Sequence, residues 1–549
     1  MDLDPYQLAG WSVDRLAAQM IVVRTTGFLF DHQVQYPVWE ADGENLRRLV
    51  ELGVGGVIFL GGSGAELALK TAGLQELALS KGLPGLLLCA DIEEGVGQRF
   101  GGGTWFAPLM ALGEIARTDL GRAVELAEVM GRATAVEARA VGLNWILGPV
   151  VDVNNNRDNP VINVRSFGED AVTVRELARA FVRGTLGWGV LTCAKHFPGH
   201  GDTDLDSHLE LPRIDHDLER LERLEFVPFR GVMGDGARDA RPYGEDGGDG
   251  DGGVDAVMTA HLEVGAIDAG EITTFSYALN TVLLRERWGF EGLIVTDALV
   301  MGAIEKRYGN AETAIRVVEG GADLMMMPVD AMGAIEAIVS AVGSGRITRE
   351  RLETSVRRIL MAKNSVFVPH GVTMAGLVGA MAGSEFQAAA RSILVESMRV
   401  RRGKALGRNG LNLVVVDDLV GCPFLSRTSG AMVIPRSQGY ETRVLDGSSE
   451  MFEVSVQRTV FQVFVRGNPL KSTAKYVARI EAWIARLGDR LDAVVVYGSP
   501  YVAESLFSRL PDSVTTVFSY GQMPIAQTLA LEWLFGVGEK EESREGMFI

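Results

Sequence analysis

The sequence has few cysteines, no long apolar run and no signal-peptide pattern. Its three cysteines, Cys89, Cys193 and Cys422, are far apart and odd in number, which does not suggest a disulfide framework. No apolar stretch approaches the roughly 20 residues that cross a membrane. The N-terminal residues lack a basic stretch followed by an apolar one. We therefore expect a cytoplasmic protein with no membrane partner.

Basic residues are also in the minority. The chain of 549 residues carries 53 Lys and Arg against 71 Asp and Glu, a net charge of −18. A surface this negative repels the phosphate backbone of nucleic acids, so no nucleic-acid partner is expected. Hydrophobic residues make up 47% of the chain and charged residues 23%, as in ordinary folded proteins. The length predicts two or more domains.

Short apolar runs recur through the first 330 residues and alternate with helical stretches such as 171–183 and 311–319. Nearly continuous apolar runs are typical of parallel strands whose sheet is covered by helices. Eight such runs predict a (β/α)8 TIM-type barrel rather than a doubly wound sheet. The predicted strands lie at 19–24, 54–60, 85–91, 144–153, 189–197, 254–261, 292–297 and 322–328.

The composition changes after about residue 370, which predicts a second, smaller α/β sandwich domain without a recognisable chemical motif. Its predicted strands, again separated by helical segments, lie at 411–416, 458–465, 493–497 and 514–519. We predict a barrel domain over 1–370, a linker at 371–385, and this second domain, of undetermined role, over 386–549.

One segment of the predicted barrel domain, 234–253, is unusually rich in glycine and acid. It holds eight glycines and six acidic residues. Clustered carboxylates can bind calcium, but the repeated Gly-rich calcium pattern and the EF-hand spacing are both missing. We therefore interpret the segment as a solvated insertion and predict no metal site.

The densest cluster of ionisable residues is KHFPGHGDTDLDSHLELP at 195–212. Pro198 and Gly199 interrupt any regular helix, so we expect a loop that leaves a strand end. Asp206 stands two residues before His208. A carboxylate so placed can hold one ring nitrogen and raise the pKa of the other. His208 is therefore a candidate proton shuttle near neutral pH.

Other roles for these histidines stay open at this point. His196, His200 and His208 could ligate zinc, although the interrupted helix removes the metalloprotease geometry and no cysteine is near. His200 and Asp206 could instead stabilise the local turn. The density of the cluster at a strand end favours a catalytic loop.

Further charged residues stand at predicted strand ends. Asp297 closes the apolar run GLIVTD, where a buried charge is costly unless paired, although it could also cap a helix. Asp91 ends another run, and Lys195 and His196 end a third. Reactive residues of a barrel lie at the carboxyl ends of its strands, so we expect these side chains to meet there.

Four segments, in their order along the chain, resemble the catalytic domain of glycoside hydrolase family 3, and specifically its β-N-acetylhexosaminidase branch. They are ADIEEGVGQRF at 90–100, PVVDVNNNRDNPVINVRSFGED at 149–170, KHFPGHG followed by DSH within 195–208, and GLIVTDALVMGAI at 292–304. The KHFPGHG and DSH pair is the most specific. The resemblance extends over about 1–365, and the second domain is similar to the α/β sandwich that many members carry.

The resemblance implies a role for individual residues and no cofactor. Asp297 would be the nucleophile, His208 the acid/base and Asp206 the residue that orients it. The hydroxyls and the acetamido group of the sugar would be held by Asp91, Arg99, Arg165, Lys195 and His196.

The sequence departs from the family pattern at one place. Where members read Asp-Gln-Glu-Gly-Gly-Arg-Val-Gln-Arg, this chain has Glu94 in place of a glycine and Val96 in place of an arginine. The exchange removes a cation and adds an anion near the expected sugar site. We expect it to affect affinity or the accepted aglycone rather than the type of reaction.

We therefore predict a retaining exo-β-N-acetylglucosaminidase that acts through a covalent glycosyl-enzyme. The resemblance also implies a role in the recycling of peptidoglycan fragments. One alternative is a phosphorylase with the same residues, because a neutral imidazole does not repel an anionic acceptor such as phosphate. The others are a β-glucosidase or β-xylosidase of the same family, and a non-catalytic sugar-binding protein.

Overall fold

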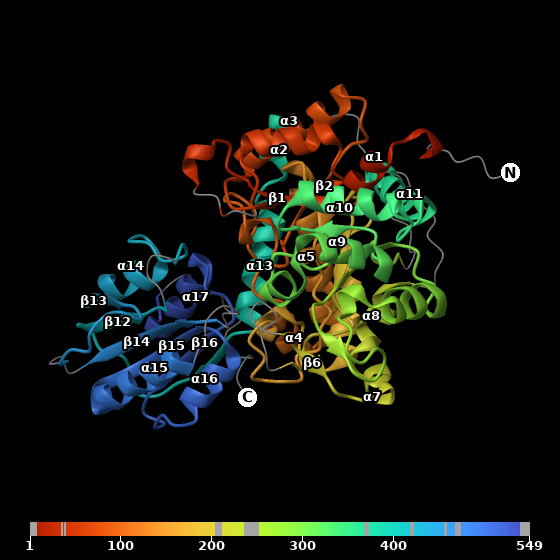
Figure 1. The fold of residues 1–549 in the computed structure, drawn as a ribbon. Coiled ribbons are helices and arrows are strands. Elements are labelled where there is room, and N and C mark those ends of the chain that lie inside the picture. Colours follow the sequence, from red (N-terminus) through yellow and green to blue (C-terminus); the bar gives the residue numbers. More distant parts are fainter. Residues whose placement is uncertain are drawn as a thin grey trace. The chain divides into compact units, whose positions relative to one another are not determined.

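The computed structural model divides into two compact units, Met1–Ala390 and Arg391–Ile549 (Figure 1). The boundary along the chain falls within helix α13 (Ser384–Glu396), just after the predicted linker at 371–385. Asp206, His208 and most of the predicted insertion at 234–253 lie outside the described residues. The structure describes residues 8–34, 37, 40–203, 211–234, 252–366, 373–417, 422–454, 458–466 and 474–537.

The first unit contains a closed ring of eight parallel strands. One sheet has the order β10-β1-β2-β3-β4 and another the order β5-β7-β9. Parallel bridges between Trp145 and Leu191 and between Val295 and Leu324 join the two sheets at both ends. The predicted barrel is thereby confirmed. Its strands are β1 (Ile21–Thr26), β2 (Gly56–Leu60), β3 (Leu87–Ala90), β4 (Trp145–Ile146), β5 (Cys193–Phe197), β7 (Ala256–Thr259), β9 (Leu293–Thr296) and β10 (Met325–Met326).

Helices follow the strands and cover the barrel (Figure 1). Several begin at a side-chain cap that the sequence supplies, such as Asp119 before α5 and Asp170 before α6, each of which accepts a backbone N–H of the first turn. The main helices are α1 (Val13–Gln19), α2 (Gly43–Leu52), α3 (Gly64–Ser80), α4 (Met110–Ala116), α5 (Leu120–Ala140), α6 (Ala171–Thr185), α7 (Leu218–Arg223), α8 (Phe226–Val232), α9 (Gly302–Gly320), α10 (Ala331–Gly343), α11 (Arg349–Val366) and α12 (Met374–Ala380).

Two glycines allow α5 and α6 to pack closely. A Cβ atom at Gly131 would lie 2.0 Å from the carbonyl oxygen of Phe181, and one at Gly184 would lie 2.0 Å from that of Glu128. A side chain at either position would therefore push the two helices apart. This contact fixes α6, which directly follows the 149–170 segment.

A small second sheet frames the segment that leaves β5. Strand β6 (Arg213–Ile214) pairs in parallel with β8 (Glu263–Val264), just after the end of β7. The chain between β5 and β6 therefore starts and ends beside the carboxyl ends of β5 and β7. Residues 204–210 of that segment lie outside the described residues.

The second unit is an α/β sandwich around one six-stranded sheet, as predicted. The sheet order is β11-β16-β15-β14-β12-β13, and all neighbours are parallel except β11 with β16. Helices α14 and α17 cover one face and α15 and α16 the other (Figure 1). The elements are β11 (Arg399–Arg401), β12 (Gly410–Val415), α14 (Gly430–Ser437), β13 (Tyr440–Leu445), β14 (Thr459–Val465), α15 (Ala474–Leu487), β15 (Leu491–Gly498), α16 (Pro500–Phe507), β16 (Thr515–Ser519) and α17 (Pro524–Phe535).

Across the described residues of both units, none of the helices combines the length and the apolar character needed to cross a lipid bilayer.

Candidate active site

A buried lysine joins two carboxylates at the carboxyl ends of β3 and β5. Lys195 Nζ lies 2.7 Å from Asp91 Oδ1 and 2.7 Å from Glu93 Oε1. The lysine and Glu93 side chains are 1% and 3% exposed, whereas the Asp91 side chain is 37% exposed. Burial alone would lower the pKa of Lys195, but the two carboxylates raise it above its ordinary value. Asp91 is thus the accessible end of a fixed ion pair.

An arginine closes this network from the other side. The Arg165 guanidinium binds Glu93 in a bidentate manner, with Nη2–Oε1 at 2.8 Å and Nε–Oε2 at 3.0 Å. Its Nη2 also lies 3.3 Å from His196 Nε2. Burial would raise the pKa of Glu93, but Arg165 and Lys195 hold it well below its ordinary value. The structure therefore brings Asp91, Arg165, Lys195 and His196 together.

A fully buried carboxylate, Asp152, holds the segment that follows β5. His196 Nδ1 donates to Asp152 Oδ2 at 2.8 Å, and the backbone N–H groups of His196 and His200 donate to the same side chain at 3.2 and 2.7 Å. Burial would raise the pKa of Asp152, but His196 and these hydrogen bonds lower it. Asp152 was not among the predicted site residues, although a lone acid inside the apolar run VVDV is a visible signal in the sequence.

Asp297 follows β9 at the same end of the barrel. The backbone N–H of Ala298 donates to Asp297 Oδ1 at 2.7 Å. Burial would raise the pKa of Asp297, but the imidazoles of His196 and His261 and this hydrogen bond lower it to about 2. The carboxylate is therefore ionised at neutral pH, as a nucleophile must be.

His261, two residues beyond the end of β7, is fully buried beside this carboxylate. Its Nδ1 lies 2.7 Å from Thr274 Oγ1 and its Nε2 lies 3.0 Å from the carbonyl oxygen of Ala298. His261 is the last residue of the predicted strand at 254–261, and the sequence indicates no role for it.

Comparison with known proteins fits this geometry. The family model for the glycosyl hydrolase family 3 N-terminal domain matches residues 12–362, and the model for the bacterial family 3 C-terminal domain matches residues 404–536. The chain belongs to glycosyl hydrolase family 3.

Named family 3 relatives are similar to different extents. The structure of a family 3 β-N-acetylglucosaminidase from Paenibacillus sp. is 31% identical, with a TM-score of 0.77, over 96% of this chain and 97% of that one. Beta-hexosaminidase A of Pseudoalteromonas piscicida is 33% identical over 44% of this chain and 41% of that protein. A β-N-acetylglucosaminidase/β-glucosidase of Cellulomonas fimi is 30% identical over 66% of this chain and 61% of that protein. The chain thus spans less than two thirds of the length of these two curated relatives.

Arg99 occupies a different position from the other predicted sugar ligands of this family 3 site. Its Nε donates to the backbone carbonyl of Asp91 at 3.0 Å. The contact holds the backbone from which the exposed Asp91 carboxylate projects. Among the contacts of the described residues, Arg99 is not paired with the Glu93, Lys195 and Arg165 network.

The residues that depart from the family pattern are buried. Glu94 is 1% exposed, and its Oε2 accepts the indole N–H of Trp105 at 3.0 Å. Val96 is fully buried. The anion that replaces a glycine therefore fixes a tryptophan three residues before Pro108, which the sequence alone did not indicate.

Within the part of the chain that the structure describes, no group of three His, Cys, Asp or Glu side chains is placed to hold a metal ion. His196 and His200, two of the three histidines considered as zinc ligands, instead bind Asp152 and Thr203 through Nδ1. His208 lies outside the described residues.

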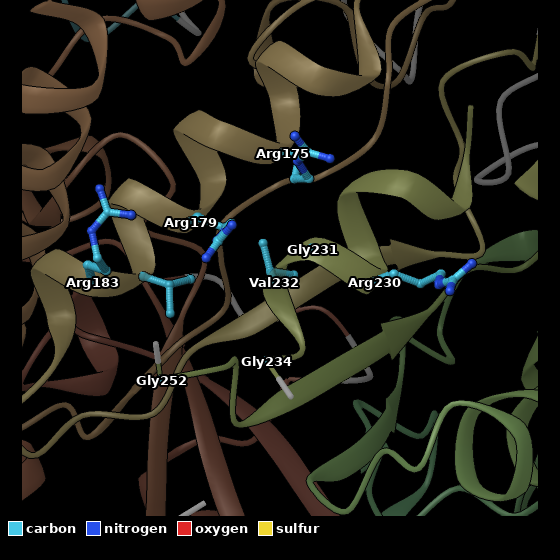
Figure 2. Close-up of a pocket in the computed structure, with 9 residues that line it drawn as sticks. Arg175, Arg179, Arg183, Arg230, Gly231, Val232, Gly234 and Gly252 are labelled. Atoms are coloured by element: carbon cyan, nitrogen blue, oxygen red, sulfur yellow. The ribbon is translucent and has the colours of Figure 1, made fainter. Parts of the chain in front are cut away.

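A separate cavity of about 200 Å³ lies between α6 and α8 and is lined by four arginines (Figure 2). Arg175 is paired with Glu176 at 2.7 Å and Arg183 with Glu128 at 3.3 Å. The arginine side chains leave their helices in different directions rather than converging on one point (Figure 2). The cavity does not include the strand-end residues of the candidate site.

Proposed function

We propose that this family 3 chain is a retaining exo-β-N-acetylglucosaminidase with Asp297 as its nucleophile. One observation carries the proposal. Asp297 is a partly buried, ionised carboxylate at the same end of the barrel as Lys195 and His196, which lie near the end of β5. Such a carboxylate can attack the anomeric carbon of a sugar bound beside it, which forms a covalent glycosyl-enzyme.

The acid and base of the proposed reaction is His208, oriented by Asp206. In the first step the protonated imidazole gives its proton to the leaving oxygen as the glycosidic bond breaks. In the second step the neutral imidazole takes a proton from water, which attacks the anomeric carbon and releases Asp297 with net retention. The support is the sequence KHFPGHG followed by DSH, in a segment that starts in β5 and returns at β6.

The exposure and charge of the side chains support the residues proposed to bind the sugar. Asp91 presents an accessible carboxylate that can accept hydrogen bonds from sugar hydroxyls. Arg165 and His196 offer polar groups next to it. Lys195 is buried, so its contribution is mainly to fix Asp91. Arg99 supports the same residue through its backbone.

The substrate of the proposal is a terminal β-linked N-acetylglucosamine, and the cellular role is the recycling of peptidoglycan fragments. The substrate is supported by the three relatives, which are named as hexosaminidases or N-acetylglucosaminidases, and the cellular role rests on the sequence resemblance to the β-N-acetylhexosaminidase branch. The Cellulomonas fimi relative is also named a β-glucosidase, so aryl β-glucosides belong in every assay beside aryl β-N-acetylglucosaminides.

A phosphorylase with the same residues is the second candidate. A histidine acid/base is neutral in the second step and therefore accepts an anionic nucleophile without charge repulsion. The deciding experiment follows the products from chitobiose and from a muropeptide by NMR, with and without phosphate. Release of β-N-acetylglucosamine before mutarotation supports the hydrolase. A sugar 1-phosphate that forms faster than free sugar would replace the hydrolase with the phosphorylase, and an initial α-anomer would refute retention.

A further inference from the structure

The turn after β9 fixes the carboxylate of Asp297 through the backbone of one residue, Ala298. The Asp297 N–H donates to the Thr259 carbonyl at 3.0 Å, so the residue starts at the end of the barrel ladder. The Ala298 N–H then donates to Asp297 Oδ1 at 2.7 Å. The direction of the carboxylate therefore depends on how the backbone of Ala298 is held.

His261 binds the same residue from the neighbouring strand. Its Nε2 lies 3.0 Å from the Ala298 carbonyl oxygen, which also accepts the Met301 N–H at 3.1 Å. A carbonyl oxygen only accepts hydrogen bonds, so Nε2 must carry a proton. The two contacts occupy both lone pairs of this oxygen and leave the Ala298 backbone little freedom to rotate.

Thr274 in turn fixes the orientation of the His261 imidazole. Its hydroxyl lies 2.7 Å from His261 Nδ1 and 3.1 Å from the carbonyl oxygen of Ala260, the residue before the histidine. His261 and Thr274 are both fully buried. Buried polar groups of this kind are costly to leave unpaired, so the arrangement resists local change.

We infer that His261 is a positioning residue for the nucleophile: it holds the carbonyl of Ala298, which limits rotation of that residue's backbone, and the N–H of the same residue holds Asp297 Oδ1. Thr274 fixes the ring that makes the first contact. The inference rests on the proposed function, because it assigns Asp297 as the attacking carboxylate. His261 need not touch the sugar in this role.

Three variants separate positioning from simple packing. His261→Leu removes both hydrogen bonds at similar volume, His261→Gln keeps an amide donor that can reach Ala298, and Thr274→Val removes only the hydroxyl. A small displacement of a reacting group can cost about 10²-fold in rate. We expect His261→Leu to lower the rate of glycosyl-enzyme formation by about 10²-fold with little change in the affinity for N-acetylglucosamine. His261→Gln should recover at least about fivefold of that loss, the rate equivalent of one hydrogen bond.

Leaving-group dependence gives a second readout. The loss in His261→Leu should be equal for aryl substrates with good and poor leaving groups, because proton donation is not disturbed. Thr274→Val should lose about fivefold. Equal losses in the leucine and glutamine variants, or a loss confined to substrate affinity, would overturn the inference. Thermal unfolding curves show that each variant compared is folded.

A trapping experiment keeps the inference distinct from the proposed function. A fluorinated N-acetylglucosaminide that stalls at the covalent stage is incubated with the full chain, and the labelled peptide is identified by mass spectrometry. An adduct on a residue other than Asp297 would refute the proposed function. An adduct on Asp297 that forms at the unaltered rate in His261→Leu would refute the positioning role and leave the function standing.

Discussion

The carboxyl end of the barrel and the network around Gln462 in the second unit bury polar side chains in different ways. At the carboxyl ends of the barrel strands buried groups are charged, as in Lys195 with Glu93 and in Asp152, whose carboxylate accepts from His196. Inside the second unit, Gln462 Nε2 donates to Asn412 Oδ1 at 2.6 Å and Tyr497 donates to Gln462 Oε1 at 3.0 Å. Buried charge is costly and is retained where chemistry needs it, whereas a satisfied uncharged network mainly specifies packing. We therefore expect the barrel end to be the reactive part and the Gln462 network of the second unit to be structural.

The strongest test of this comparison removes the charge that would react. Asp297→Ala should lower kcat/KM on an activated aryl N-acetylglucosaminide on the order of 10⁴-fold, because no group remains to form the covalent intermediate. Added azide should restore part of the rate and give the α-glycosyl azide, since a small anion can take the vacated place. Near-normal turnover without azide would show that another residue is the nucleophile.

Removing the charge of Asp152 should have the next largest effect. In Asp152→Asn one of the groups that now donate to the carboxylate must face an amide N–H, so His196 loses its fixed orientation. We expect kcat/KM to fall by about 10²-fold. Asp158→Asn, an exposed carboxylate in the same segment, is the matched control and should keep full activity. Equal activity of the two variants would mean that Asp152 serves stability alone.

A second buried lysine sharpens the comparison within the barrel unit. Lys363 Nζ donates to Gln19 Oε1 at 2.7 Å, and burial lowers the pKa of Lys363 from 10.5 to about 7. In the described part of the chain, no carboxylate pairs with it. The pKa of Lys363 is lower in the folded state than in the unfolded state. The free energy of unfolding is therefore not reduced by this lysine above pH 10.5, and it falls as the pH is lowered toward 7.

Lys363→Met should therefore gain stability over the parent protein as pH is lowered. The difference in unfolding free energy should change by up to about 1.4 kcal/mol per pH unit between these two pKa values. Denaturant unfolding at pH 7, 8.5 and 10 measures it. Lys81→Met, at an exposed lysine, is the control and should show no such slope. A flat difference for Lys363→Met would mean that the lysine stays charged in the folded protein.

The smallest effect is expected in the second unit. Tyr497→Phe leaves Gln462 Oε1 without its donor and should cost about 1 kcal/mol of unfolding free energy. The turnover of aryl N-acetylglucosaminides should remain within about twofold, because no charge at the barrel end is altered. Unfolding and turnover are measured on the same preparation. A large loss of turnover would contradict the division between a reactive and a structural unit.

Much of the fold could be predicted because buried parallel strands consist of nearly continuous apolar residues in the sequence. The runs at 144–153 and 322–328 were longer than the strands, which are Trp145–Ile146 and Met325–Met326. In the first run the apolar residues continue past the strand and carry Asp152 into the site. The sequence therefore located the segment and showed the acid within it, but not that Asp152 binds His196 and His200.

The candidate site was predictable where chemistry and position coincide, as for Asp91, Lys195 and Asp297 at strand ends. The contact between His261 and Ala298 joins residues 37 positions apart and depends on how two neighbouring strands end. Likewise, the sequence showed that Glu94 replaces a glycine but not that its carboxylate turns to Trp105. Such contacts depend on how residues far apart in the chain are brought together by the fold, and no local sequence pattern encodes this.

The paired glycines between α5 and α6 have a consequence for how this enzyme family can be altered. Gly131 and Gly184 each face a carbonyl of the opposite helix, so the two contacts together fix the position of α6 against α5. Arg165 lies six residues before the first residue of α6, at the end of the 3-10 turn Asn163–Arg165. A methyl group added at Gly131 or Gly184, both buried between the two helices, would therefore shift α6 and the segment that precedes it. We expect affinity to respond to such a change at a helix contact, without any change to the groups proposed to break the bond.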